Sequence, residues 1–281
     1  MLARVPASSA NLGPGFDTLA VALELYVEVS VEPADEFSIT STGEGAGLFD
    51  DERHLAAVVA REVLGHSRFA LSVDSAIPLS RGLGSSASLA LAAAAAAGAT
   101  NPLAVATHVD GHAENAAASL LGGLVTAAVK GGEPVARSLG LDAQWRFVVV
   151  VPETQLATAD ARRVLPREVP FADAVANLNA MGLLIAGLAD RNAFVAGSMT
   201  DTLHQPYRMG LLPFASPLLA TLSDAGASGT CWSGAGSTML GLAGVECAHE
   251  VAAAARAFLE HEGVAGTAFV LDADRVGLVT R

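Results

Sequence analysis

The chain has 281 residues, 52% of them hydrophobic and 16% charged, and its formal net charge is −13. This composition is typical of a globular protein, and the acidic balance argues against nucleic acid and anionic membrane as partners, because both need a basic surface. The two cysteines, Cys231 and Cys247, make no disulfide framework and suit a reducing compartment. No signal peptide is visible, so we expect a cytoplasmic protein.

Alternation of apolar and polar side chains marks the strands of the first half. Between residues 23 and 31, leucine and valine alternate with mostly polar residues, as in a half-buried antiparallel strand. The strands expected here fall at 2–6, 23–31, 37–40, 69–77 and 124–129. The helices expected here fall at 51–64, 85–99, 102–110 and from 114 to a break at Gly122-Gly123. The apolar run 87–99 is too short to cross a bilayer and indicates a buried helix.

A second unit is predicted to begin with the apolar strand 148–151. Its further strands are expected at 228–232, 238–242, 266–271 and 275–280, and its helices at 158–164, 171–188, 192–200, 215–225 and 246–260. Strands with helices inserted among them, without a strict β-α-β repeat, indicate an α+β fold. We predict two domains, residues 1–150 and residues 151–281.

The segment Pro78–Ala87, PLSRGLGSSA, is the most informative one. Its glycines allow the backbone to approach a ligand, and Ser85 and Ser86 are expected to cap the helix that follows. A helix N-terminus suits a phosphate. A Walker P-loop is excluded because the only lysine is Lys130, and a dinucleotide-binding loop is disfavoured because residues 78–81 intervene after the strand. An ordinary strand–turn–helix corner is the alternative.

Two polar segments accompany this loop. PASSANLGPGFD, residues 6–17, offers Asn11 and Asp17 to a substrate, or else forms a turn with local hydrogen bonds. HVDGHAEN, residues 108–115, has two histidines at the spacing of a zinc site but no glutamate between them and no third ligand. Its polar side chains favour a Mg²⁺ or transition-state role, the alternative being a solvated loop with a helix cap. These side chains are Asp110, Glu114 and Asn115.

Arginines and a second glycine loop stand in the later part of the chain. Arg162, in TADAR, and Arg208, in HQPYR, have the fork geometry that binds carboxylates, although either alone is more typical of a surface ion pair. Together they suggest a carboxylate clamp. CWSGAGSTML, residues 231–240, forms either a tight hairpin or a glycine loop that closes over a ligand.

In this order the motifs resemble those of the GHMP kinase superfamily, from Val5 to about Leu242. The strings SANLGPGFD, GHAENAA followed by LLGG, TADARRVLP and HQPYR resemble the homoserine kinase branch most. The resemblance implies a two-domain α+β fold. Its N-terminal ATP-binding domain has a left-handed β-α-β unit, and its C-terminal domain is ferredoxin-like. It also implies transfer of a phosphoryl group from ATP to L-homoserine, giving O-phospho-L-homoserine in threonine biosynthesis.

The same resemblance implies roles for individual residues. ATP is expected to contact Pro78, Arg81, Gly82, Leu83, Gly84, Ser85 and Ser86. The substrate carboxylate would bind Arg162 and Arg208, and its ammonium Asp17 with Asn11. Asn115 would lie near the reacting hydroxyl, with His112 beside it.

The expected magnesium site departs from the pattern of the family. Ala104 and His108 occupy candidate positions for the metal-binding glutamate of the family, and only Asp110 is acidic nearby. Mg²⁺ would therefore bind Ser86 and Asp110. Alternative functions are another GHMP small-molecule kinase and a catalytically silent ATP-binding homologue. A homodimer is compatible with the sequence, which leaves the oligomeric state open.

Overall fold

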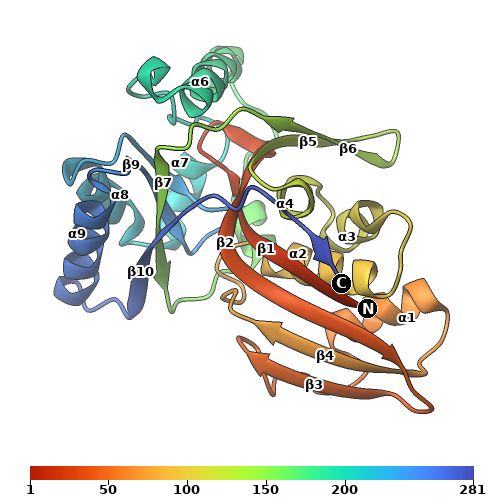
Figure 1. Ribbon diagram of the computed structural model, residues 1–281. Helices are drawn as coiled ribbons and strands as arrows, with labels where there is room; N and C mark the ends of the chain where they lie inside the picture. The colour runs from red at the N-terminus through yellow and green to blue at the C-terminus, as the bar shows by residue number, and fades with distance from the viewer.

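Two β-sheets with their helices make up the computed structural model, which describes residues 1–281 (Figure 1). The first sheet has the order β11-β1-β2-β4-β3, with β5 paired to β2 and β6 to β5. Its strands are β1 (Leu2–Asn11), β2 (Gly15–Pro33), β3 (Ser38–Gly43), β4 (Phe69–Ser75), β5 (Leu124–Lys130), β6 (Glu133–Leu139) and β11 (Val279–Thr280). The long strand β2 is the centre of this sheet, because it pairs with β1, β4 and β5.

Helices α1 (Leu55–Leu64), α2 (Ser85–Ala96), α3 (Pro102–Asp110) and α4 (Glu114–Leu121) accompany the first sheet. β3 and β4 are parallel and are joined through α1, which forms the expected β-α-β unit. Nine residues of α2 are buried, mostly alanines. Because alanine is small, α2 packs closely on β1 and β2 and brings its N-terminus to the middle of the molecule (Figure 1).

The second sheet is antiparallel throughout, with the order β10-β7-β9-β8. Its strands are β7 (Trp145–Pro152), β8 (Gly229–Trp232), β9 (Met239–Gly244) and β10 (Gly266–Leu271). The helices α8 (Ala215–Asp224) and α9 (Ala248–His261) pack on it and complete the β-α-β-β-α-β pattern of a ferredoxin-like domain. Three further helices are inserted between β7 and α8: α5 (Thr158–Arg163), α6 (Phe171–Ala189) and α7 (Gln205–Arg208).

Strand β7 is buried on both faces and joins the two cores. Phe147 and Val149 belong to the large core of the first sheet, whereas Val148 and Val150 belong to the core under α8 and α9. This explains the continuous apolar run in the sequence, since a strand buried on both sides has no polar face. The chain also returns at its end to the first sheet, where β11 pairs with β1. The division into domains at residue 150 stays a prediction.

Two predicted elements differ from the structure, and one strand lies outside the predicted set. Strand β6 was not predicted, because Pro134 and its charged neighbours give it an edge-strand composition without a clear apolar face. The helix predicted at 192–200 is wrong, since only a single 3-10 turn forms at Arg191–Ala193 before Gly197 takes a φ of +83°. The strand predicted at 275–280 is reduced to its last two positions, β11.

Helix α6 is long and apolar enough to cross a membrane by length and composition alone. In the fold it is attached to both halves of the chain. Asn177 Nδ2 donates to the Pro14 carbonyl at 2.7 Å, and Trp145 Nε1 donates to the Gly187 carbonyl at 3.1 Å. These contacts hold one side of α6 against the folded chain.

Candidate active site

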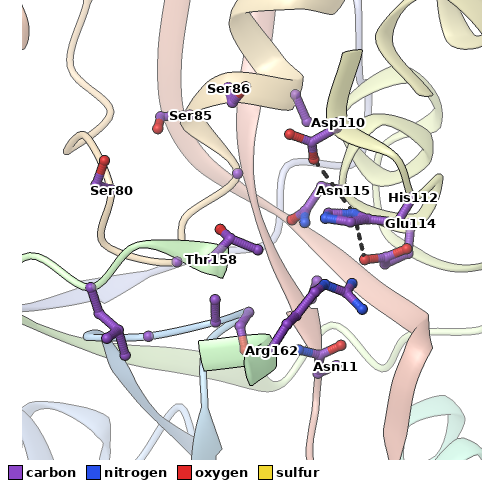
Figure 2. Close-up of a pocket in the computed structure, with 18 of the residues that line it drawn as sticks. Asn11, Ser80, Ser85, Ser86, Asp110, His112, Glu114, Asn115, Thr158 and Arg162 are labelled. Atoms are coloured by element: carbon purple, nitrogen blue, oxygen red, sulfur yellow. Dashed lines mark hydrogen bonds and ion pairs between the residues drawn. The ribbon is translucent and has the colours of Figure 1, made fainter. Parts of the chain in front are cut away.

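A polar cleft of about 790 Å³ lies where the two sheets meet, and 16 of its 20 lining residues are not hydrophobic. Its walls come from segments far apart in the sequence: the end of β1, the glycine loop before α2, the turn between α3 and α4, helix α5, and the loop between β8 and β9 (Figure 2). Eleven predicted site residues line it: Asn11, Asp17, Gly82, Gly84, Ser85, Ser86, Asp110, His112, Asn115, Arg162 and Arg208.

The N-terminus of α2 opens directly into this cleft. Its N-cap is Gly84, with a φ of +67°, and no side chain caps the helix. The expectation that Ser85 and Ser86 cap α2 is therefore wrong, because both already lie inside the helix. Neither their backbone N–H groups nor that of Ala87 has a partner in the protein. Three unpaired donors at the positive end of a helix make an anion-binding site.

The two glycine loops of the sequence pack against each other. Ser233 Oγ donates to the Gly82 carbonyl at 2.7 Å, and Thr238 N donates to the Arg81 carbonyl at 3.1 Å. A Cβ on Gly82 would collide with the Ser233 carbonyl oxygen. The loop at 233–237 is thus a ligand-facing loop supported by the first, and glycine at 82 is required by this close approach as well as by its φ of +78°.

Three residues of the predicted ATP loop do not line the cleft: Pro78, Arg81 and Leu83. Leu83 is buried in the core. The side chain of Arg81 donates to the Pro152 carbonyl and the Leu79 carbonyl at 2.8 Å each. Arg81 therefore fixes the loop to the end of β7 and does not line the cleft.

Both polar atoms of the Asn11 amide make hydrogen bonds within the protein. Its Nδ2 donates to the Gly234 carbonyl at 2.7 Å, and its Oδ1 accepts from the Asp17 backbone N–H at 3.0 Å. The residue joins the turn after β1 to the second glycine loop. In this arrangement Asn11 shapes the cleft wall, and its polar atoms are already paired.

Asp17 and Arg162 form a two-point ion pair in the cleft. Arg162 Nη2 lies 2.7 Å from Asp17 Oδ1, and Nη1 lies 3.0 Å from Oδ2. The hydrogen bond to Asp17 is the main reason why the pKa of Arg162 is raised above its usual value. Phe16 lies beneath, with its ring centroid 5.5 Å from the guanidinium carbons of both Arg162 and Arg208. The ring of Phe16 thus makes cation–π contacts with both arginines on one side of the site.

Arg208 is almost wholly buried, at 1% exposure. Its Nε donates to the Ala161 carbonyl at 3.2 Å, and its Nη1 donates to the Gly234 carbonyl at 2.9 Å and contacts His204 Nδ1 at 3.0 Å. Burial, followed by the charge of Arg162, lowers the pKa of Arg208 to about 10, which leaves it charged at neutral pH. Its Nη2 has no partner within the protein and remains available to an anion.

His204 holds Arg208 in place through the contact between its Nδ1 and Nη1 of the arginine. Its ring stacks on Phe16, and its Nε2 lies 3.0 Å from the Gly13 carbonyl oxygen. A carbonyl only accepts, so Nε2 carries the proton and Nδ1 accepts from Arg208. Burial lowers the pKa of His204 to about 4, so the ring is neutral in this arrangement.

The turn between α3 and α4 gathers three titratable side chains at the cleft. His112 Nδ1 lies 3.0 Å from Glu114 Oε1 and 3.5 Å from Asp110 Oδ2 (Figure 2). Burial lowers the pKa of His112, but Glu114 and Asp110 outweigh it, and the net pKa is raised above its usual value. Burial raises the pKa of Asp110 against the opposing effects of His112 and Ser86.

The sequence did not assign every residue of this site a contact. Glu114 was given a general Mg²⁺ or transition-state role, with a helix cap as the alternative, and its side chain is only 3% exposed and contacts His112. Ser8, two positions into the first motif, is wholly buried and donates to Asn115 Oδ1 at 2.9 Å. The polar character of both segments was visible in the sequence. What was not visible is which of their side chains turn inward.

Known proteins with similar sequences and structures agree on one family. Residues 53–132 match the family described as GHMP kinases N terminal domain. The homoserine kinase of Moorella thermoacetica is 38% identical over 85% of this chain and 86% of its own, and that of Desulfitobacterium hafniense is 35% identical over 98% and 97%. The crystal structure of homoserine kinase from Cytophaga hutchinsonii superposes with a TM-score of 0.87 at 26% identity, covering 99% of this chain and 96% of that one. The chain therefore belongs to the homoserine kinase family of the GHMP kinases.

Proposed function

We propose that the protein transfers the γ-phosphoryl group of ATP to the hydroxyl of L-homoserine, giving O-phospho-L-homoserine. The observation that carries this proposal is the juxtaposition of a free helix N-terminus with an acid–arginine pair in one cleft. The first suits phosphates, and the second suits a small molecule that carries both an ammonium and a carboxylate.

The phosphates of ATP are assigned to the N-terminus of α2. The unpaired N–H groups of residues 85–87 and the hydroxyls of Ser85 and Ser86 are the donors available there. Gly82 and Gly84 allow the loop to approach Ser233 and Ser8 closely, because a Cβ at either position would collide with these residues. A phosphate there also benefits from the helix dipole, so the loop acts without the lysine of a P-loop.

Homoserine is assigned to the opposite wall. Its carboxylate would bind Arg162 and the free Nη2 of Arg208, and its ammonium would bind Asp17. The Asp17–Arg162 pair of the ligand-free protein has the same two charges as the substrate, and both side chains are more than one-third exposed. Binding then exchanges one set of charge contacts for another.

The chemical step is assigned to the segment that contains His112 and Asn115. Neither is a strong general base toward an alcohol at neutral pH, because an amide does not titrate and the raised pKa of His112 favours its cationic form. Phosphoryl transfer tolerates this, since it depends mainly on in-line positioning and on neutralising charge at the phosphoryl oxygens. Asn115 would hold the acceptor hydroxyl, and His112 would add positive charge.

Magnesium fits the donor set on one side of the α2 N-terminus. The hydroxyl of Ser86 lies beside the carboxyl group of Asp110, and its hydrogen bond to that group opposes the rise in the pKa of Asp110. No group of three or more His, Cys, Asp or Glu side chains is placed to hold a metal by itself. One carboxylate and one hydroxyl nevertheless suit Mg²⁺, which keeps several waters and is held largely by nucleotide phosphates. When bound it would neutralise phosphate charge.

The test is an assay of ADP release with Mg²⁺ and ATP across several alcohols. We expect turnover with L-homoserine well above that with mevalonate or a sugar, and none when Mg²⁺ is removed. Turnover with another alcohol but not with homoserine would keep the kinase and reject the substrate. Binding of Mg·ATP by calorimetry without turnover on any alcohol would identify a catalytically silent homologue.

A further inference from the structure

Ser8 lies in β1, below the cleft, and contacts the side chain that the proposed mechanism places at the reacting hydroxyl. It is 0% exposed, and its Oγ is 2.9 Å from Oδ1 of Asn115, at the start of α4. Ser8 and Asn115 are 107 positions apart in the chain. Because a buried hydroxyl needs a partner, this contact is a fixed part of the fold rather than an optional one.

The direction of this hydrogen bond follows from a cluster of three buried serines. Ser88 Oγ donates to the Pro6 carbonyl at 2.9 Å, since a carbonyl only accepts. Ser119 is then the donor in its contacts with Ser88 at 3.1 Å and with Ser8 at 3.4 Å, and its one proton serves either of them. Neither serine requires the hydroxyl proton of Ser8, which leaves it for Oδ1 of Asn115.

Donation to Oδ1 settles which way the amide faces. With its oxygen turned down toward Ser8, Asn115 turns Nδ2 away, and this nitrogen makes no hydrogen bond within the protein although the residue lines the cleft. An amide in the opposite orientation would present its oxygen to the cleft. Such an oxygen would repel the phosphoryl oxygens, whereas an N–H donor stabilises them.

The phosphate loop is packed on the same pair. A Cβ on Gly84 would collide with Ser8 Oγ and would lie 3.0 Å from Asn115 Oδ1. The N-cap of α2 therefore lies directly against the hydrogen bond between Ser8 and Asn115. Phosphate donors and the amide of Asn115 are thereby held in one packed unit.

We propose that Ser8 is a positioning residue, which holds the Asn115 amide with its NH₂ group toward the reacting atoms. This inference rests on the proposed homoserine kinase activity. Ser8 itself touches neither substrate. Its loss should slow the chemical step while leaving both binding sites in place.

The first test compares Ser8→Ala with the matched variant Ser88→Ala, which removes an equally buried hydroxyl that does not touch Asn115. We expect kcat of Ser8→Ala to fall about tenfold, the effect of losing one hydrogen bond to a catalytic group, with the KM for ATP and for homoserine changed less than twofold. Ser88→Ala should keep kcat within about twofold. Thermal unfolding of both variants separates a loss of fold from a loss of rate.

The second test uses Asn115→Asp, because a carboxylate has two equivalent oxygens and no orientation to fix. Single-turnover transfer from radiolabelled ATP measures slow rates directly. In this background Ser8→Ala should cost clearly less than in the natural sequence. A kcat for Ser8→Ala within twofold of the unchanged protein, or an equal cost in both backgrounds, would overturn the inference. Failure of the unchanged protein to phosphorylate homoserine would instead reject the proposed function.

Discussion

Asp17 and Arg162 pair with each other through both carboxylate oxygens, at 2.7 and 3.0 Å, in the space assigned to the substrate. The two side chains are 37% and 38% exposed, so water screens the pair and it contributes little to stability. The pair matters because its internal charge contacts can be exchanged for contacts with a ligand. A zwitterion can satisfy both partners when it separates them, whereas a ligand with one charge leaves the other partner alone.

The desamino analogue 4-hydroxybutanoate should therefore be a poor substrate. It offers a carboxylate to Arg162 but nothing to Asp17, and we expect kcat/KM to be lower than with L-homoserine by about tenfold or more. Asp17→Asn should narrow this ratio, because it removes the carboxylate that is left unpaired. Steady-state kinetics with both alcohols measure the ratio, and an unchanged ratio in Asp17→Asn would contradict the assignment of Asp17 to the ammonium.

Arg162 and Arg208 should respond differently to removal. Arg162→Ala is expected to raise the KM for homoserine about tenfold or more, with little change in the KM for ATP or in thermal stability. Arg208→Ala should in addition lower the free energy of unfolding by about 3 kcal/mol, because it strips hydrogen bonds from buried partners. Kinetics combined with denaturant unfolding distinguishes the two, and equal stability losses would show that the difference in burial does not matter.

His204 should make the protein sensitive to acid. Its pKa falls from 6.5 toward about 4 on folding, so the unfolded chain binds a proton that the folded one rejects. This contribution to stability is complete above pH 6.5 and is lost as the pH falls toward 4, with a slope of at most about 1.4 kcal/mol per pH unit. His204→Gln should reduce that slope in urea unfolding measured between pH 7 and 4. An unchanged slope would assign the acid sensitivity to other groups.

Glycines with similar positive φ values should differ in their tolerance of alanine. Gly82 and Gly98 have φ values of +78° and +84°, but a Cβ on Gly82 meets the Ser233 carbonyl whereas one on Gly98 meets nothing within 4 Å. Gly98→Ala should cost only the left-handed strain, about 1–2 kcal/mol. Gly82→Ala should cost more and should also weaken ATP binding. Calorimetric binding of ATP and urea unfolding of both variants check this, and equal effects would argue against the contact between the loops.

Much of this site could be predicted from the sequence because its motifs are short and local. Gly82 and Gly84 precede a run of small residues, and this pattern indicates a backbone that approaches a ligand. The resemblance to the GHMP kinases added the ligands of residues already singled out, namely the substrate carboxylate for the two arginines and the reacting hydroxyl for Asn115. Both kinds of inference need only the residue types and their order along the chain.

The rest depends on contacts between distant segments. The amide of Asn11 is held by the carbonyl of Gly234, 223 residues away, and no local pattern contains that pairing. The helix cap moved from Ser85 to Gly84 because the loop turns through a left-handed residue just before the helix. Strand β6 lacked a sequence signal because an edge strand with proline has no apolar face to reveal.

The carbonyl of Gly234 accepts from both Asn11 and Arg208, and Gly234 N donates to the Ala10 carbonyl. Strand β7 also packs its side chains into both hydrophobic cores. Together these contacts leave no free hinge between the sheets. We expect the two halves to melt together, in one calorimetric transition whose van't Hoff and measured enthalpies agree. Two separate transitions would show independent folding units. A rigid joint also means that ligand binding energy is not consumed by closing one lobe onto the other.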